Sequence, residues 1–273
     1  MTLNCNGKLI DLTTPKIMGI LNLTPDSFFD GGKYSDEQRI LNQVGKMINE
    51  GATFIDMGAY SSRPGATFVS LEKEISRIVP IIKVVLNEFP EAILSIDTFR
   101  SQVADACLKE GAAMINDISA GIQDHEMFKI IVKHGVPYCM MHMKGTPQNM
   151  QQKTDYDDLL MDVLYYFSER IAKAREYHIN DIIVDPGFGF SKTLEQNYKL
   201  LQNLELLQSL DLPILVGLSR KSMIYKVLES TPQEALNGTT ALNMLALQKG
   251  AHILRVHDVA AAMECIQLNE HLN

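Results

Sequence analysis

Short apolar runs that follow a glycine and end on polar residues recur along the chain. Four such junctions read NEGATFIDMGA (49–59), KEGAAMINDIS (109–119), KHGVPYCMMHM (133–143) and QKGAHILRVHD (248–258). A glycine after a helix favours the left-handed conformation that ends it, and the apolar run behind the glycine is typical of a buried parallel strand. The pattern therefore predicts a chain in which helices and strands alternate.

Four further apolar runs complete the set of predicted strands: KIMGILN (16–22), AILSID (92–97), DIIVDPG (181–187) and PILVGLS (213–219). Amphipathic stretches separate the strands, as in 37–51, where Ile40 and Val44 share one helical face. The helix predicted around 71–88 contains Pro80, and we expect the proline to interrupt and kink it.

Eight strands, each followed by a helix, predict a single (β/α)8 TIM barrel domain over residues 1–273. A doubly wound open sheet is the alternative, but it would usually carry a G-x-G-x-x-G turn after an early strand, and the sequence has none. The first fifteen residues contain Asn6-Gly7 and predict an N-terminal β-hairpin that caps the lower end of the barrel.

The composition, 46% hydrophobic and 21% charged, is that of a soluble globular protein. A formal charge of −8 argues against a general binder of nucleic acid or anionic membranes. The sequence shows neither a signal peptide nor an apolar run long enough to span a bilayer, so we expect a cytoplasmic protein. Its four cysteines are scattered without a C-x-x-C pair, which favours reduced thiols over disulfides or a zinc site.

Every predicted strand ends on polar residues, which are Asn22, Asp56, Asp97, Asn116 with Asp117, His142, Asp185, Ser219-Arg220-Lys221 and Arg255-Val256-His257. A single Asn or Asp at a strand end is more often a turn former or a helix cap than a site residue. Eight polar ends at one face are harder to assign to turns, because barrel enzymes build their sites there. Asp97 and Asp185 directly end apolar runs, so their carboxylates would be partly desolvated and would need a donor.

The charges at these ends are sorted into two halves. Acids and amides come from strands two, three, four and six, whereas Lys221, Arg255 and His257 come from strands seven and eight, where barrels often hold phosphate. Arg255 and His257 lie two apart and face the same side of a strand, which favours anion binding over a core role for the histidine. The acid-amide half suits a heterocycle with N–H donors. The cationic half suits a diphosphate with Mg²⁺, for which an Asn carbonyl is an acceptable ligand.

Three loops carry further candidate residues. The stretch TPDSFFDGG (24–32) follows Asn22, and GAYSSRPGA (58–66) brings serines and an arginine to a Pro-Gly turn. In DPGFGFSKT (185–193), we expect Phe190 to form a wall for a flat ligand, because loops lie on the surface.

Seven motifs, in order and over essentially the whole chain, resemble those of dihydropteroate synthases: ILNLTPDSFFDGG, DMGAYSSRPGA, SIDTFRSQVADACLKEGAAMINDISAG, MHMKGTPQNMQ, DPGFGFSKT, GLSRKSMI and LRVHDV. The resemblance implies a transferase that joins (7,8-dihydropterin-6-yl)methyl diphosphate to 4-aminobenzoate, giving 7,8-dihydropteroate and diphosphate in folate biosynthesis. It also implies inhibition by sulfonamides, which mimic the aminobenzoate, and a homodimer.

The same resemblance assigns residues to the substrates. The implied pterin pocket is Asp97, Asn116, Asp185 and Lys221. The implied diphosphate set is Ser62, Arg63, Arg255 and His257, with Asp56 supporting the loop that carries Ser62. The implied aminobenzoate contacts are Phe28, Arg63, Pro64, Phe190 and Ser222, where a helix begins. Asn22 is the implied ligand of Mg²⁺, and Asp97, Asp185, Lys221 and Arg63 are the implied catalytic set.

The implied mechanism is dissociative: diphosphate leaves first, and the pterin ring delocalises the cation that the amine then attacks. The sequence departs from the family pattern at three positions in the first two loops. Tyr60 stands where an acidic or small residue is common, Ser62 where many members have threonine, and Phe29 where serine is common.

Three other classes fit less well. A barrel that binds methyltetrahydrofolate for a corrinoid methyltransferase would have no use for Arg255, His257 or the Ser-Arg-Lys triplet. A barrel for phosphosugars or flavin phosphates usually has a glycine-rich phosphate motif after strand seven or eight, whereas PILVGLSRK has one glycine. A protein that only binds would not need the full set of motifs.

Overall fold

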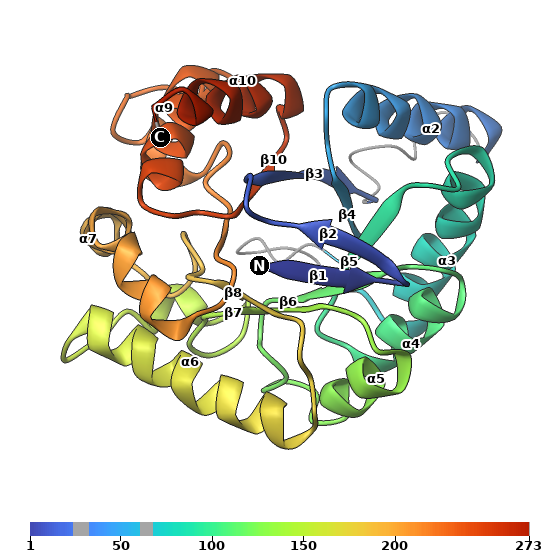
Figure 1. The fold of residues 1–273 in the computed structure, drawn as a ribbon, viewed down its shortest axis with the longest axis horizontal. Coiled ribbons are helices and arrows are strands. Elements are labelled where there is room, and N and C mark those ends of the chain that lie inside the picture. The colour runs from blue at the N-terminus through green and yellow to red at the C-terminus, as the bar shows by residue number, and fades with distance from the viewer. Residues whose placement is uncertain (24–32, 61–67, 273) are drawn as a thin grey trace.

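Eight parallel strands form a curved sheet that the helices surround, as Figure 1 shows for the computed structural model, which describes residues 1–23, 33–60 and 68–272. The strands are β3 (Lys16–Asn22), β4 (Phe54–Gly58), β5 (Ile93–Asp97), β6 (Met114–Asp117), β7 (Tyr138–Met141), β8 (Ile182–Asp185), β9 (Leu215–Val216) and β10 (Ile253–Val256). Their order in the sheet is β8-β7-β6-β5-β4-β3-β10-β9. A parallel bridge between Val184 and Ile214 joins the two edge strands and nearly closes the sheet. The TIM barrel prediction is confirmed.

The helices follow the strands around the outside of the sheet. They are α2 (Lys33–Asn49), α3 (Leu71–Glu88), α4 (Ser101–Lys109), α5 (Met127–His134), α6 (Leu159–Glu176), α7 (Leu194–Gln202), α8 (Ser222–Tyr225), α9 (Leu236–Gln248) and α10 (Val259–Glu270), with the 3₁₀ helices η1 (Met150–Gln152) and η2 (Leu204–Leu210). The four junction glycines all have positive φ, as predicted: +102° at Gly51, +103° at Gly111, +64° at Gly135 and +89° at Gly250. Within the described residues, no helix is long and apolar enough to cross a bilayer.

The predicted interruption at Pro80 is wrong, because α3 runs unbroken from Leu71 to Glu88. Pro80 lies on the exposed side of the helix, where water can bond the carbonyl group that the missing N–H leaves unpaired. Ile78 and Ile82, one on each side of the proline, are buried in the core. Packing of both halves against the sheet therefore outweighs the loss of one hydrogen bond.

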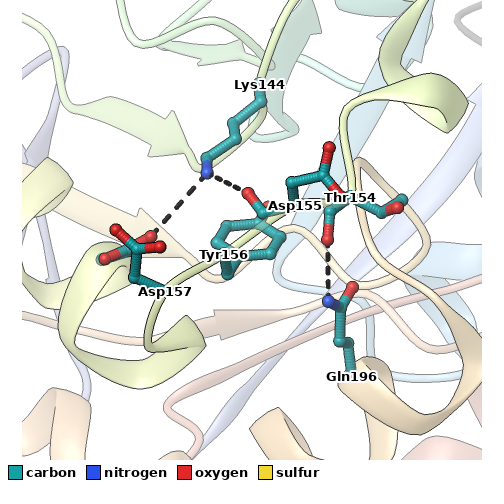
Figure 2. A pocket seen from close by; sticks show the side chains of 7 residues that line it. Lys144, Thr154, Asp155, Tyr156, Asp157 and Gln196 are labelled. Atoms are coloured by element: carbon teal, nitrogen blue, oxygen red, sulfur yellow. Dashed lines mark hydrogen bonds and ion pairs between the residues drawn. The ribbon is translucent and has the colours of Figure 1, made fainter.

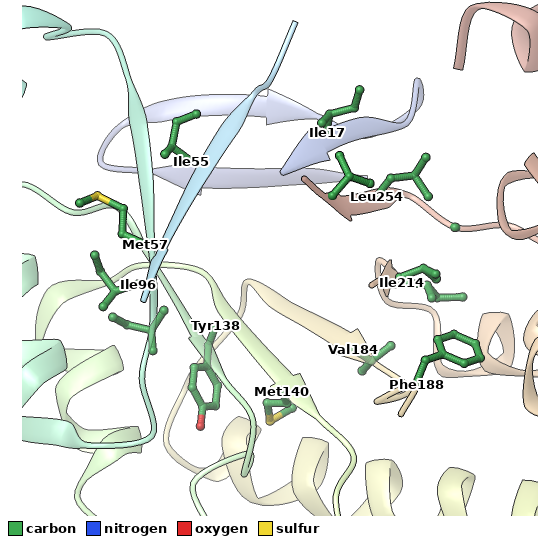
Figure 3. Packing of buried hydrophobic residues seen from close by; sticks show 14 of the residues in the cluster. Ile17, Ile55, Met57, Ile96, Tyr138, Met140, Val184, Phe188, Ile214 and Leu254 are labelled. Carbon is green, nitrogen blue, oxygen red and sulfur yellow. The ribbon is translucent and has the colours of Figure 1, made fainter. Parts of the chain in front are cut away.

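Side chains that alternate along each strand form two apolar layers. One set packs outward against the helices, and Figure 3 shows part of this layer with Ile17, Ile55 and Leu254. The next residues along the strands, such as Met18 and Ile253, point into the lower barrel. This alternation follows from the period of two in a strand, and it explains why the strand sequences are apolar on both faces.

The N-terminal hairpin fills the lower end of the barrel, as predicted. Strands β1 (Thr2–Cys5) and β2 (Lys8–Asp11) pair antiparallel, and φ is +51° at Asn6 and +85° at Gly7, as a type I′ turn requires. Leu3 and Ile10 are buried in one cluster with the inward residues of the lower strands. The cap therefore leaves only the upper end, where the carboxyl ends of the strands lie, open for a site.

Candidate active site

A cavity of about 650 Å³ lies at the carboxyl ends of the strands. The predicted site residues that line it are Asn22, Asp97, Phe190, Lys221, Ser222, Arg255 and His257. They come from β3, β5 and β10 and from the segments after β8, β9 and β10, so the barrel brings together residues far apart in the sequence. Beyond Val216 the chain follows the cavity wall through Gly217 and Ser219, which is why β9 is shorter than the predicted run 213–219.

A buried carboxylate, Asp56 on β4, is the centre of the hydrogen-bond network beneath this cavity. Its Oδ1 accepts from Ser95 Oγ at 2.6 Å, and its Oδ2 accepts from Asn116 Nδ2 at 3.0 Å. Oδ2 also accepts from Arg255 Nε at 2.6 Å. Because Asp56 is fully buried, these donors from β5, β6 and β10 compensate for the lost water. A direct contact of Asp56 with residues 61–67 falls outside the described residues.

Arg255 joins the two halves of the site that the sequence suggested were separate. Its Nη2 donates to Asp97 Oδ2 at 2.6 Å, so one guanidinium bridges Asp56 and Asp97. Burial alone would lower the pKa of Arg255, but the two carboxylates outweigh burial and raise it. Burial raises the pKa of Asp97 to about 7, against the effect of Arg255. Arg255 is thus a permanent cation at the junction of the acidic and basic residues.

Lys221 and Asp185 form the second charged pair. Burial lowers the pKa of Lys221 to about 8, while Asp185 opposes the shift. Burial also raises the pKa of Asp185, which Lys221 in turn opposes. Lys221 Nζ donates to the carbonyl of Phe188 and lies 5.0 Å from the ring centroid of Phe190. The cation therefore bonds to a backbone carbonyl beside an aromatic wall and acts electrostatically on the buried carboxylate of Asp185.

Loops after β9 and β10 are tied together at two points. The backbone N–H of His257 donates to Ser219 Oγ at 3.2 Å, and Ser219 Oγ lies 3.0 Å from His257 Nδ1. The Ser219 hydroxyl thus contacts both the backbone and the ring of His257. Arg220 has a φ of +55° and makes two bonds of 2.8 Å to the carboxylate of Asp258. These bonds fix the backbone that presents Lys221 and Ser222.

Some predicted strand-end residues do not line the cavity. Asn116 and Asp185 are 4% and 5% exposed and lie beside lining residues rather than among them. Asp117 accepts from Tyr138 Oη at 2.6 Å and from Ser119 and Gly121, so it is a turn former and not a site residue. The expected convergence of all eight strand ends is therefore incomplete. The alternation of side chains along β6, which points Asn116 inward and Asp117 outward, explains this difference.

His142 is, like Asp56, a further strand-end residue outside the cavity lining. Its ring is buried, packs edge-on against Tyr166 at 4.8 Å between centroids, and has Nδ1 3.0 Å from Lys192 Nζ. Lys192 is only 4% exposed, although its sequence pattern does not predict a site residue. Lys192 lies in a polar loop, and such a loop does not predict that one of its lysines is buried.

Tyr60, one of the departures from the family pattern, lines the cavity. Gln148 Nε2 donates to its hydroxyl at 3.0 Å, and its ring meets Phe99 edge-on at 5.2 Å between centroids. The guanidinium of Arg100 lies 5.2 Å from the ring centroid. Tyr60 is thus held by neighbours from the segments after β5 and β7. The predicted residues Phe28, Phe29, Ser62, Arg63 and Pro64 lie outside the described residues, and their roles stay predictions.

A second pocket, of about 360 Å³, lies beside the loop after β7 and is shown in Figure 2. Lys144 Nζ donates to the carbonyl of Asp155 at 2.7 Å and lies 3.7 Å from the ring centroid of Tyr156. Gln196 Nε2 donates to the carbonyl of Thr154 at 2.8 Å. These polar groups of the second pocket bond to one another, and none of the predicted site residues lines the pocket.

Asn22 is the one predicted metal ligand. It ends β3, is half-buried and lines the cavity, so its carbonyl oxygen can reach a ligand there. Within residues 1–23, 33–60 and 68–272, no group of three or more His, Cys, Asp or Glu side chains could hold a metal ion. The donor set fits Mg²⁺ shared with substrate phosphates, because that ion keeps few protein ligands and several waters.

Known proteins resemble the chain over its whole length. A family model described as pterin binding enzyme matches residues 18–257. The dihydropteroate synthase of Escherichia coli K12 is 42% identical over 272 residues, which cover 99% of this chain and 96% of that protein. A crystal structure of Yersinia pestis dihydropteroate synthase with a sulfonamide drug complex has a TM-score of 0.93 at 41% identity, covering 100% of this chain and 99% of that one. The Xanthomonas albilineans enzyme with 4-aminobenzoic acid has a TM-score of 0.92 at 37% identity, covering 99% of this chain and 97% of that one.

Proposed function

The chain belongs to the dihydropteroate synthases of the pterin-binding enzyme family, and on this premise we propose that the cavity at the barrel mouth is its active site. The enzyme is a transferase of folate biosynthesis that condenses (7,8-dihydropterin-6-yl)methyl diphosphate with 4-aminobenzoate. The main support for this location of the active site is the cluster in which Arg255 bridges Asp56 and Asp97 at the cavity that Lys221 also lines. Relatives named dihydropteroate synthase do not favour the alternative, a corrinoid methyltransferase barrel.

In the proposed reaction the bond between the methylene carbon and the diphosphate oxygen breaks first, and its electron pair leaves with the diphosphate. The pterin ring delocalises the resulting cation. The amine of 4-aminobenzoate then forms the new C–N bond and releases a proton. This sequence needs no strong general base, so positioning and charge stabilisation supply most of the rate, at roughly 3–4 kcal/mol for one well-placed donor.

The pterin is proposed to bind between Asp185 and Lys221, with Asp97 and Asn116 at its other edge. Gly187 N–H already donates to Asp185 Oδ1 at 2.8 Å, which fixes the orientation of the carboxylate. A carboxylate held in this way can accept parallel hydrogen bonds from the amino-pyrimidinone edge. Lys221 would exchange the carbonyl of Phe188 for the carbonyl of the ring.

The diphosphate is proposed to bind on the side of Arg255 and His257, with Ser62 and Arg63. A guanidinium has five N–H groups, and the bonds to Asp56 and Asp97 use two, so Arg255 retains donors while it lines the cavity. Asn22 would hold Mg²⁺ together with diphosphate oxygens, and the bound ion would neutralise charge on the leaving group.

The aminobenzoate is proposed to bind near Phe190 and Ser222, with Phe28, Arg63 and Pro64. Helix α8 begins at Ser222, as expected, but it has only four residues. The helix dipole is therefore a smaller contribution than expected, and the Ser222 hydroxyl becomes the more important donor to the carboxylate. Sulfonamides would compete at the same place.

The deciding experiment mixes the pterin diphosphate, radiolabelled 4-aminobenzoate and Mg²⁺ with the purified chain. Labelled dihydropteroate is the expected product. Absence of product, under conditions in which the Escherichia coli enzyme is active, would refute the proposed function.

Asn22→Ala is expected to raise the Mg²⁺ concentration needed for half-maximal activity by about tenfold or more, because a metal site is sensitive to single ligands and their supports. Asn22→Asp keeps an oxygen ligand and is the matched control. Titration of Mg²⁺ in the radiolabel assay measures the effect. An unchanged Mg²⁺ dependence in Asn22→Ala would remove this residue from the metal site.

Pterin affinity is expected to fall as pH rises above about 8. The pKa of Lys221 is lowered by burial from 10.5 to about 8, so the side chain is a cation below that pH and neutral above it. A neutral amine is a weaker donor to the ring carbonyl. Calorimetry across this range measures the dissociation constant, and Lys221→Met should show weaker binding without the same pH dependence. Equal pH profiles for the two proteins would contradict the role.

We also propose that the enzyme is a cytoplasmic homodimer. Helices α9 and α10 expose Leu236, Leu245 and Leu268, which are 40%, 39% and 63% accessible. A second copy of the chain could cover this apolar surface. Light scattering is expected to give twice the mass of one chain, and the mass of a single chain would exclude the dimer.

A further inference from the structure

A buried lysine in the loop after β8, Lys192, has no role in the reaction described above. Lys192 Nζ lies 3.0 Å from each of three acceptors: the carbonyls of Gly187 and Phe190 and Nδ1 of His142. An ammonium group has three N–H donors, so the three acceptors match it. Within the described residues, no carboxylate forms an ion pair with Lys192. Burial accordingly lowers the pKa of Lys192 to about 7.

The acceptors of Lys192 belong to the backbone that carries two proposed substrate contacts. Gly187 is the residue whose N–H orients the carboxylate of Asp185, and its carbonyl also accepts from Phe190 N–H at 3.1 Å. Phe190 forms part of the cavity wall and faces Lys221. Lys192 therefore holds, from below, the peptide groups next to both contacts.

His142 limits how this loop can move. Gly187 has a φ of +70°, and a Cβ atom there would lie 2.1 Å from the carbonyl oxygen of His142. Burial, followed by the charge of Lys192, holds the pKa of His142 well below its usual range. The imidazole is thus neutral, and its Nδ1 can accept a bond from Lys192. The end of β7 and the loop after β8 are thereby joined through one ammonium group.

We propose that Lys192 is a positioning residue, which sets Asp185 and Phe190 and thereby the relative placement of the pterin and the aminobenzoate. The inference rests on the proposed roles of Asp185 and Phe190. Its physical basis is that an ammonium with three fixed acceptors favours one loop conformation, whereas an apolar side chain would remove the hydrogen bonds that the Phe190 carbonyl and His142 Nδ1 receive from Lys192 and one of the two that the Gly187 carbonyl receives. A shift of the loop by a fraction of an ångström would misalign the reacting atoms.

Lys192→Met tests the proposal, because methionine keeps a long apolar side chain and removes all three donors. Its affinity for the pterin diphosphate is expected to fall about tenfold or more, the effect of about 1.4 kcal/mol, with a lower kcat. Lys192→Arg, which keeps the charge and several donors, should recover part of the affinity. Lys144→Met is the matched control: Lys144 lies at the neighbouring second pocket, and its loss should leave pterin affinity unchanged.

A purely structural role predicts a different result. If Lys192→Met only lowers the unfolding temperature, while calorimetric affinity and kcat of the folded protein stay at wild-type values, the proposal is overturned. Wild-type activity in the same assay separates this outcome from failure of the proposed function.

A second pair of variants decides the question if Lys192→Met does not fold. His142→Asn keeps an acceptor near the position of Nδ1, and His142→Phe removes it. The phenylalanine variant should bind the pterin diphosphate more weakly than the asparagine variant. Equal affinities would overturn the proposal.

Discussion

Arg255→Ala is expected to lose both stability and affinity for the pterin diphosphate. The guanidinium lies 2.6 Å from Asp56 Oδ2 and 2.6 Å from Asp97 Oδ2, and Asp56 is fully buried. Removing one partner of a buried ion pair leaves an uncompensated charge, which costs about 3–5 kcal/mol of folding free energy. Urea denaturation measures this loss.

The binding effect can be separated from the stability effect with a second substitution. Asp56→Asn in the Arg255→Ala background removes the unpaired carboxylate, so it should recover part of the stability without recovering diphosphate binding. Arg255→Ala should lower the affinity for the diphosphate substrate far more than the affinity for a pterin that lacks phosphates. Equal losses for the two ligands, measured by calorimetry, would contradict the assigned role of Arg255.

Asp185→Asn is expected to weaken pterin binding by about 2–4 kcal/mol, or about 30- to 1,000-fold. In the proposed orientation the carboxylate would accept from two donors of the pterin edge, whereas an amide would turn one N–H group toward them. Asp117→Asn is a matched control, because Asp117 also ends a strand and is buried but bonds to Tyr138 and its own turn. It should lower stability and leave pterin affinity unchanged. Near-unchanged affinity in Asp185→Asn would show that the proposed pterin orientation is wrong.

The barrel could be predicted from local sequence because its signals are local. Glycines such as Gly51 and Gly111 end helices through positive φ, and the hairpin turn needs positive φ at Asn6 and Gly7. The apolar run 213–219 predicts a longer strand than β9, because such a run does not reveal how many of its residues pair with a neighbouring strand. Pro80 was misjudged because tertiary packing decides whether a helix tolerates a proline.

The candidate site was predictable as a set of strand-end residues but not as a network. Arg255 and Asp56 are 199 positions apart, and only the closure of the barrel brings their side chains together. Asn116 and Asp117 are adjacent in the sequence, and their side chains point to opposite faces of β6. The alternation of side chains along a strand predicts this difference. Lys192 lies in a polar, glycine-rich loop, and nothing in its local sequence indicates that its ammonium group is buried beside His142.

The hairpin at the lower end has a consequence for the order of folding. Leu3 and Ile10 precede all the barrel strands in the chain, yet their cluster includes Leu215 and Ile253 from the last two strands. During synthesis, the apolar face of the hairpin therefore lacks part of its cover until β9 and β10 have left the ribosome. Docking of the hairpin is therefore expected to be completed late in folding, since part of its binding surface comes from the last two strands. Full protection of the hairpin then reports completion of the fold, because its cover is complete only when β9 and β10 are in place.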